Sequence, residues 1–284
     1  MKHAMGWLRD LPDWNDYTIS SKKVKPFLLK CTAFGDEDGK ELPDKYDIGE
    51  HVELPRIETQ KISDCTAHSG TFTYETYVKF LEQEDPTHIK FSDLSRLFLY
   101  KTTRDLGGWK GDTGAYLRTT MKAMAKYGVP PEEFYKYDVS KFDRKPPAAV
   151  YDIAKNFQAL IYYRLDKHLW SPEKIINSIK LNICSNRTCM FGFTIYSNMG
   201  NSGNVALPRK GDRERGGHAI VAIGFDNKYK IAKSIGAFKC ANSWGKKWGK
   251  GGFLWLPYDY IRKGLAVDWW VLNSAEWKNA SCFN

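Results

Sequence analysis

The first half of the chain carries apolar side chains at the spacing of one helix face. After Cys65 such residues recur at Ala67, Tyr74, Tyr77, Val78 and Leu81, and this pattern predicts a helix. The helix should end near Asp85–Pro86, because proline keeps the residue before it out of the helical conformation. Similar patterns predict further helices over residues 91–104, 116–127 and 148–155.

Beyond residue 157 the pattern changes to short apolar runs separated by turns, which favours strands. The predicted strands cover residues 157–165, 190–196, 218–225, 237–243 and 252–256. A short helix over 172–181 and a glycine- and charge-rich loop over 198–217 lie between them. Helices in one half and antiparallel strands in the other are typical of an α+β protein with two lobes.

We expect one domain over residues 1–284. Its parts are an N-terminal arm over 1–55, a mainly helical lobe over 56–156 and a mainly antiparallel β lobe over 157–284. The arm is rich in turns, as in residues 10–14 and 34–40, so we expect it to wrap on the surface. With 284 residues, 42% of them hydrophobic, the chain can bury a substantial core.

The formal net charge of +10 would attract acidic partners in a general way. The lysines of residues 22–25 and 246–247 form no nucleic-acid motif, so we expect a solvated lysine-rich surface and no specific nucleic-acid partner. Apolar runs are too short to span a membrane, and charge near the N-terminus interrupts any signal-peptide core. These features predict a cytoplasmic protein with reduced thiols that does not engage a membrane.

The six cysteines form no C-x-x-C pair, so we expect no metal site and no organic cofactor. Cys184 and Cys189 are close enough in sequence either to form a disulfide or to remain free. Cys65 follows Asp64, whose side chain we expect to cap the predicted helix. A thiol in that first turn feels the positive end of the helix dipole, which favours the thiolate. The alternative is that Cys65 is a small buried apolar side chain.

A histidine and an asparagine lie on two predicted strands that should be neighbours. His218 opens one strand, and Asn242 lies near the end of the next. Antiparallel pairing would let the Asn242 amide oxygen accept the imidazole N–H of His218, leaving the other ring nitrogen to Cys65. A histidine alone would more often be a core residue, but the combination predicts a nucleophile, a base and an orienting amide.

Three motifs resemble those of papain-like cysteine peptidases and occur in the same order. They are Gln60…Cys65-x-Ala67, Gly217-His218-Ala219 and Asn242-Ser-Trp-Gly-x-x-Trp-Gly-x-x-Gly-Phe. The whole chain is similar to the compact microbial branch of that family, including residues 6–17, 94–100 and 256–260. The resemblance implies a papain-like two-lobed fold with a cleft between the lobes, and a cysteine-type endopeptidase acting on proteins or peptides.

The resemblance also implies roles for individual residues. Cys65 would be the nucleophile and His218 the acid and base. Asn242 would orient His218, and Trp244 would shield their hydrogen bond from water. The Gln60 side chain and the Cys65 backbone N–H would form an oxyanion hole for the charge that develops on the substrate carbonyl.

Four glycines are candidate substrate-binding residues. Gly107–Gly108 resembles the glycine pair that holds extended substrate by backbone hydrogen bonds, with a plain loop as the alternative. Gly216 and Gly217 precede His218, and Gly216 lacks the side chain that often walls a specificity pocket. We therefore expect a roomier pocket there.

Two features depart from the pattern of the family. Gln60 and Cys65 are separated by five positions instead of six, which puts the oxyanion role of Gln60 in question. Asp64 takes the place of a small residue, and its charge opposes the thiolate. His68 would be either a second base or a packing residue. Two alternatives to a peptidase stay open: a weak or inactive papain-like scaffold used for binding, and a transpeptidase or ligase that passes the acyl group to an amine.

Overall fold

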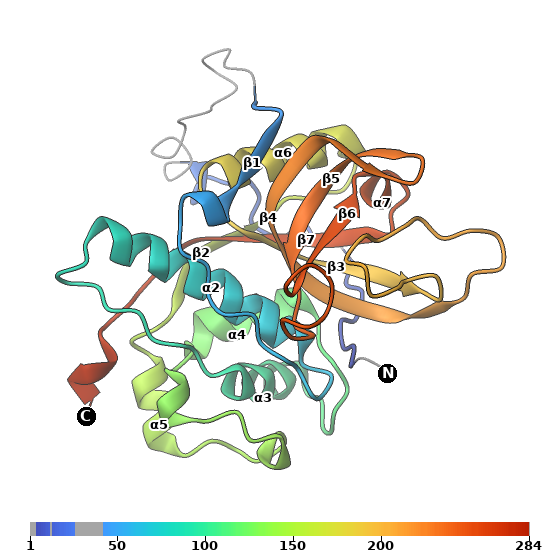
Figure 1. Ribbon diagram of the computed structural model, residues 1–284. Coiled ribbons are helices and arrows are strands. Elements are labelled where there is room, and N and C mark those ends of the chain that lie inside the picture. The colour runs from blue at the N-terminus through green and yellow to red at the C-terminus, as the bar shows by residue number, and fades with distance from the viewer. Residues whose placement is uncertain (1–3, 12, 26–41, 284) are drawn as a thin grey trace.

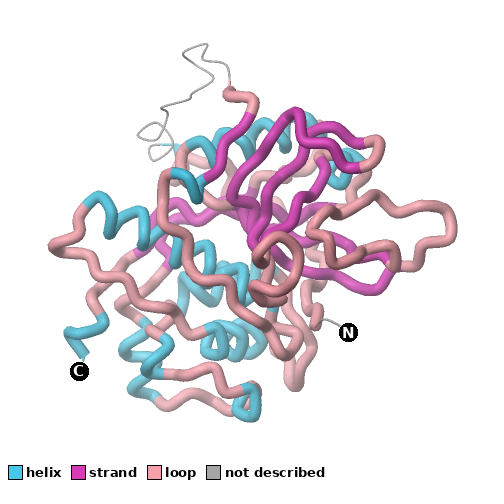
Figure 2. Tube along the Cα trace, viewed as in Figure 1, coloured by secondary structure: helices cyan, strands magenta, loops and turns pink. Residues whose placement is uncertain are grey.

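The computed structural model describes residues 4–11, 13–25 and 42–283, so the turn predicted over 34–40 lies outside the described residues. Several helices gather on one side of the sheet, and other helices lie with the strands at the top of the view in Figure 2. Among the described helices, none has the length and apolar character needed to cross a lipid bilayer.

Of the described α-helices, three lie in the first half of the chain and three, generally shorter, in the second half. They are α2 (Cys65–Glu84), α3 (Arg96–Gly107), α4 (Leu117–Tyr127) and α5 (Ala148–Ala154), followed later by α6 (Pro172–Cys184) and α7 (Asp259–Arg262). Short 3₁₀ turns are η2 (Ile48–Glu50), η3 (Glu132–Phe134), η4 (Val139–Lys141) and η5 (Ala280–Phe283). The predicted start of α3 at residue 91 is wrong, because Ser95 caps the helix by accepting a hydrogen bond from the Phe98 N–H.

The strands form one antiparallel sheet (Figure 1). They are β1 (Lys45–Asp47), β2 (Ala159–Arg164), β3 (Cys189–Tyr196), β4 (Glu214–Ile231), β5 (Ser234–Ala241), β6 (Phe253–Pro257) and β7 (Ala266–Ala275). The order is β2-β7-β3-β4-β5-β6, and β1 pairs with β4. The pattern missed β1 and β7, and β4 begins inside the segment predicted as a loop. The N-terminal arm thus contributes a strand to the sheet.

Each face of the sheet builds its own core, and β4 contributes to both. Ile220 and Ala222 point into the core that is shared with α6, whereas Val221 and Ile223 point into the core that is shared with α2 and α4. This alternation follows from the two-residue period of a strand. Because Cys65 belongs to the second core, the first turn of α2 is held directly against β4.

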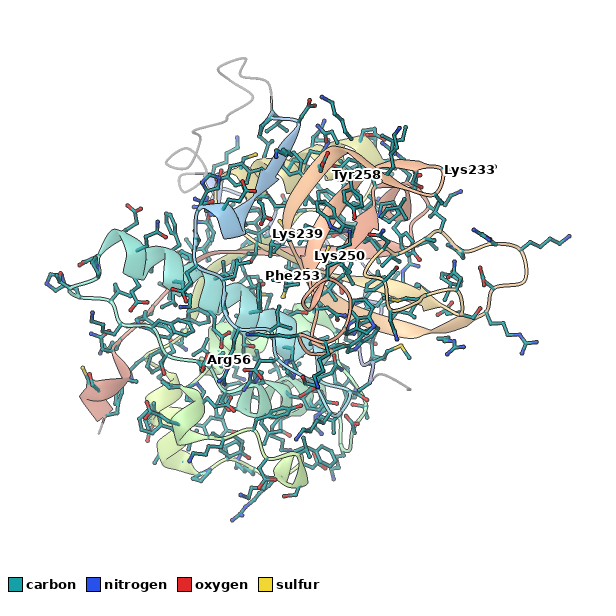
Figure 3. All side chains as sticks on the ribbon, in the orientation of Figure 1. Arg56, Lys233, Lys239, Lys250, Phe253 and Tyr258 are labelled. Atoms are coloured by element: carbon teal, nitrogen blue, oxygen red, sulfur yellow. The ribbon has the colours of Figure 1, made fainter. Side chains whose placement is uncertain are left out.

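Charged side chains project from the sheet surface, as the sticks of Figure 3 show for Lys233 at the turn between β4 and β5. Lys239 and Phe253 lie on the neighbouring strands β5 and β6, with the ammonium 5.0 Å from the ring centroid. This contact is a cation–π interaction at a partly exposed site. At the start of β3, Cys189 is a free buried thiol, as is Cys184 at the end of α6, so these two residues form no disulfide.

The turn after α4 generates the first prediction. Gly128 adopts φ +74 and ψ −173, a conformation almost confined to glycine, and an added Cβ would lie 1.8 Å from the Ala154 carbonyl oxygen. Gly128→Ala should therefore lower the free energy of unfolding by roughly 3 kcal/mol or more, measured by urea denaturation.

Gly264→Ala is the matched control, because Gly264 also has positive φ but an added Cβ meets no atom within 4 Å. It should cost only the backbone strain of about 1 kcal/mol. Equal losses in the two variants would contradict the steric explanation for Gly128.

Candidate active site

Cys65 is the first residue of α2, where the helix meets the sheet. The Ala219 N–H of β4 donates a hydrogen bond to Cys65 Sγ over 3.4 Å, and the thiol is fully buried. His218 immediately precedes Ala219 in the chain. The sulfur and the histidine are therefore brought together from positions 153 residues apart.

The predicted pairing of His218 with Asn242 is present. His218 Nε2 lies 2.8 Å from Asn242 Oδ1, just beyond the end of β5. The Ser243 N–H also donates to Asn242 Oδ1 over 2.8 Å, which identifies that atom as the amide oxygen. His218 Nε2 must then be the donor, so the lone pair of the neutral ring lies on Nδ1.

Trp244 covers the ring of His218. The two rings stack with centroids 4.6 Å apart and planes 19° from parallel. The indole N–H of Trp244 donates to the Ala4 carbonyl oxygen over 3.1 Å. The His218–Asn242 hydrogen bond is therefore buried beneath an aromatic side chain, where a hydrogen bond is stronger than in water.

Asp64 stands at the N-cap of α2, but the prediction that its side chain caps the helix is wrong. Its carboxylate makes no capping hydrogen bond. Instead Asp64 Oδ2 accepts the hydroxyl proton of Tyr137 over 2.7 Å and faces His68 Nε2 at 3.5 Å. His68 is buried edge-on against Tyr137, so it packs under the helix start and pairs with Asp64.

The surroundings of Cys65 keep its sulfur protonated. Burial raises the pKa of the Cys65 thiol to about 12, and the charge of Asp64 acts in the same direction. The backbone N–H groups of Ala219, Gly6 and Thr66 lower the pKa, but less than burial raises it. In this arrangement burial and the charge of Asp64 favour the thiol form of Cys65 over the thiolate.

Gln60 is anchored next to Asn242. Its backbone N–H donates to the Ser243 carbonyl over 2.8 Å, and its side-chain oxygen accepts from the Ser243 hydroxyl over 2.5 Å. Gln60 Nε2 donates to the Ile62 carbonyl over 3.0 Å. The shortened segment between Gln60 and Cys65 thus keeps the glutamine close to the site. The side-chain amide N–H₂ of Gln60, however, donates its hydrogen bond to the backbone of that segment.

The four candidate glycines fall in two places. Gly107 and Gly108 end α3, where Gly108 is the C-cap with φ +73. Gly216 and Gly217 lie in β4 at the site, and an added Cβ on Gly216 would be 3.5 Å from the side chain of Met5. The space expected beside Gly216 is therefore next to a residue of the N-terminal arm.

The arm does not simply wrap on the surface, because residues 4–8 lie along the site. The N–H groups of Gly6 and Trp7 both donate to the Gly217 carbonyl over 3.2 Å. On the opposite side the Ala115 N–H donates to the Gly6 carbonyl over 2.8 Å, and the Leu8 N–H donates to the Ala115 carbonyl over 3.0 Å. The arm thus bridges the β lobe and the helical lobe as an extended strand.

Gly6 packs closely against the loop just before Cys65, and its backbone N–H also reaches the Cys65 thiol. A Cβ on Gly6 would lie 1.9 Å from the Ser63 carbonyl oxygen, two residues before Cys65. Sequence reasoning missed this arm and the backbone of Ala115 as elements of the site. A peptide backbone can bind in this way whatever its side chains are, so the resemblance of residues 6–17 to the family did not reveal that the arm lies at the site.

The fold and the site define a two-lobed protein with a cysteine at a helix start and a His–Asn pair on the facing sheet. A family model described as papain family cysteine protease matches residues 42–266. An uncharacterized peptidase C1-like protein of Acanthamoeba polyphaga mimivirus is 32% identical over 282 residues, covering 94% of this chain and 86% of that protein. The chain belongs to the papain family of cysteine proteases.

Solved structures agree with the α+β papain-like fold expected from the sequence. Xylellain, a cysteine protease from Xylella fastidiosa, matches with a TM-score of 0.73 at 26% identity, covering 95% of this chain and 96% of that one. A procathepsin B from Trypanosoma congolense matches in fold with a TM-score of 0.65 at 18% identity, covering 87% and 82% of the two chains. The chain is therefore a papain-like cysteine peptidase in family and fold.

The position of Asp64 generates a prediction about thiol reactivity. Asp64→Asn removes the negative charge beside Cys65 but keeps an oxygen that can accept the Tyr137 hydroxyl. The pKa of Cys65 should fall by about one unit, because the thiolate loses a repulsive neighbour. The measurement is the rate of alkylation by iodoacetamide as a function of pH.

Asp152→Asn serves as the control, since Asp152 pairs with Lys155 on the exposed side of α5. Its alkylation profile should match that of the unaltered chain. An unchanged or raised midpoint in Asp64→Asn would contradict a destabilising effect of Asp64 on the thiolate.

Proposed function

We propose that this protein is a cysteine-type endopeptidase that hydrolyses peptide bonds through Cys65 and His218. The observation that carries the proposal is the joint placement of the buried Cys65 sulfur against Ala219 and of His218 against Asn242. A nucleophile beside a base that is oriented by a third group is the arrangement that acyl transfer requires.

In the proposed reaction the arm first leaves the cleft. Loss of its cover hydrates Cys65 and lowers the pKa of the thiol, so that His218 Nδ1 can take the proton. The thiolate attacks the substrate carbonyl, the C–S bond forms, and negative charge develops on the carbonyl oxygen. His218 then gives its proton to the leaving amine, and water hydrolyses the acyl-enzyme with His218 as base.

The oxyanion has two candidate donors. The backbone N–H of Cys65 belongs to the first turn of α2, whose N–H groups lack partners within the helix. Gln60 Nε2 would have to exchange the Ile62 carbonyl for the oxyanion. Each such donor contributes on the order of a hundredfold in rate when it is aimed at the developing charge.

Substrate backbone would bind where the arm now binds. The carbonyl of Gly217 and the N–H and carbonyl of Ala115 are the groups that hold the extended arm. These groups would hold an extended peptide by the same hydrogen bonds. We place substrate binding at Gly217 and Ala115, with Gly216 beside them. To Gly107 and Gly108 we assign the structural role of ending α3.

One observation favours a second candidate function, an inactive scaffold. Cys65 is fully buried beneath residues of its own chain and holds its proton, with a pKa raised to about 12. A chain that never opens would bind partners through its surface and hydrolyse nothing. The two candidates are separated by chemical labelling of the sulfur.

The catalytic assignment predicts the behaviour of two variants. Cys65→Ala should abolish cleavage of a fluorogenic peptide pool, and His218→Ala should reduce it by about a hundredfold or more, because general acid and base catalysis is lost. Both variants should lose labelling by a peptidyl chloromethyl ketone, followed by intact-protein mass.

Cys240→Ala is the matched control, because Cys240 is a fully buried thiol on β5 of the same sheet. It should keep both labelling and cleavage. Absence of cleavage and labelling in every variant and condition would favour the inactive scaffold. Product masses measured with and without added amine distinguish hydrolysis from acyl transfer. An amide product would show that the enzyme transfers the acyl group to an amine, as a transpeptidase or ligase does.

The position of the arm predicts that loosening it activates the enzyme. Trp7→Ala removes the largest buried side chain of residues 4–8, so the cleft should open more often. The initial rate of peptide cleavage should rise by about tenfold, because the competent fraction of molecules rises. Rates of full-length proteins measured at equal concentration check this.

Trp14→Ala is the control, because Trp14 lies further along the same arm and is 87% exposed. It should leave the rate unchanged. A rate in Trp7→Ala that equals that of the unaltered chain, with the fold intact by circular dichroism, would contradict a blocking role for the arm.

A further inference from the structure

The side chain of Trp7 leaves the arm and enters a pocket in the β lobe. Only 5% of Trp7 is exposed. The indole lies on Gly192 of β3, where an added Cβ would be 1.9 Å from the ring atom Cε2. It also lies on Gly217 of β4, where an added Cβ would be 2.6 Å from Cε3. Gly192 is opposite Ala219, and Gly217 is opposite Thr194. The two glycines therefore lie diagonally on one face of adjacent strands and create the space for a flat ring.

The inner end of this pocket is a carboxylate. Asp268 of β7 is fully buried, and its Oδ2 accepts the indole N–H of Trp7 over 3.1 Å. Asp268 Oδ1 accepts the indole N–H of Trp270 over 2.7 Å and lies 3.4 Å from Arg164 Nη1. One oxygen of the carboxylate is thus held by the core, while the other faces the occupant of the pocket.

The surroundings of Asp268 favour a neutral donor in the pocket. Arg164 already supplies a positive charge to Asp268, and it also pairs with Asp166 over 2.9 Å. Asp166 Oδ2 accepts the Asp268 N–H over 2.7 Å, which locks the position of the carboxylate. Burial raises the pKa of Asp268 to about 7, so part of its charge is already neutralised near neutral pH.

An empty pocket would leave Asp268 Oδ2 without its donor. A buried acceptor that loses its partner destabilises the structure by more than an ordinary hydrogen bond contributes, and water or a ligand must replace it. An indole fills the space over the glycines and donates at its far edge. A phenyl ring fills the space but provides no hydrogen-bond donor. A small apolar side chain neither fills the space nor provides a donor.

The pocket lies next to the sulfur along the peptide backbone. Trp7 follows Gly6, whose backbone N–H is close enough to Cys65 to lower the pKa of the thiol. The backbone of the arm is held at Gly217 and Ala115 on either side of the cleft. A peptide bound to the same groups would therefore place one of its side chains in this pocket near the bond that is cleaved.

We propose that the pocket formed by Gly192, Gly217 and Asp268 selects substrates with tryptophan near the scissile bond, and that Trp7 is its internal occupant. The proposal rests on the proposed peptidase function, and it adds the chemistry of the side chain that is recognised. Asp268 acts as a specificity-determining residue by accepting the N–H of the ring, and the glycines act by leaving room for it.

The experiment compares peptides that differ only in the residue recognised, namely Trp, Phe, Arg and Ala. For the full-length enzyme, kcat/KM should be highest with Trp and about tenfold lower with Phe, the loss expected for one hydrogen bond to a carboxylate. Ratios between peptides cancel the fraction of molecules in which the arm is open. A preference for Arg or Ala, or equal rates with Trp and Phe, would overturn the proposal.

Two variants test the residues of the pocket. Gly192→Ala adds a Cβ where the indole lies, in a backbone conformation that alanine can adopt, and should reduce the Trp-to-Ala ratio by at least tenfold. Asp268→Asn keeps the shape of the side chain but weakens the acceptor, and should bring the Trp-to-Phe ratio close to one. Gly200→Ala, at which an added Cβ meets nothing within 4 Å, should change neither ratio.

A binding measurement separates this proposal from the peptidase function. The double variant Cys65→Ala with Trp7→Ala empties the pocket and removes the nucleophile. A fluorescein-labelled peptide with Trp should bind it at least tenfold more tightly than the Phe peptide, measured by anisotropy, and adding Gly192→Ala should remove that difference. Binding without cleavage in the active chain would reject the peptidase and keep the pocket, whereas cleavage and binding without a Trp preference would reject the pocket alone.

Discussion

The structure depends on the contact between the first turn of α2 and the first half of β4. β4 pairs with β1, β3 and β5 and carries side chains into both cores of the protein. A slip of β4 by one residue would exchange Ile220 and Val221 between the two cores and would carry His218 away from Asn242. The register that builds the hydrophobic cores is therefore the same register that places the sulfur, the imidazole and the amide. Few substitutions in this region can alter packing without altering chemistry.

Burial of that contact acts in two opposite directions. Beneath Trp244, exclusion of water strengthens the hydrogen bond that orients His218. Beneath the arm, the same exclusion disfavours the charged form of Cys65. The hydrogen bond that orients His218 is thus present in the structure, whereas ionisation of Cys65 is disfavoured. In the proposed mechanism, opening of the arm would change the hydration of the sulfur, while the hydrogen bond between His218 and Asn242 is already formed.

Local patterns and short motifs were sufficient for the start of α2, for α4 and for the pairing of His218 with Asn242. They were insufficient where contacts between residues distant in the sequence determine the local structure. β7 escaped detection because Trp269 and Trp270 are buried in different cores, so the strand shows no alternation of polar and apolar residues. The capping role of Asp64 failed because Tyr137, distant in the sequence, provides a competing donor for its carboxylate. The position of Trp7 depends on two glycines that lie far away in the sequence, on β3 and β4. The sequence around Trp7 therefore could not predict where its side chain is bound.

The arm is tethered to the cleft that it fills, and this has a consequence for any ligand of the site. A covalently attached segment competes at an effective concentration that dilution of the protein does not reduce, typically on the order of millimolar for a short flexible link. The apparent dissociation constant of an inhibitor measured on the full chain equals its intrinsic value divided by the open fraction. All compounds that need an open cleft would therefore look weaker by the same factor, and their ranking would be preserved. For compounds that bind the closed molecule, the apparent dissociation constant would not be raised by this factor.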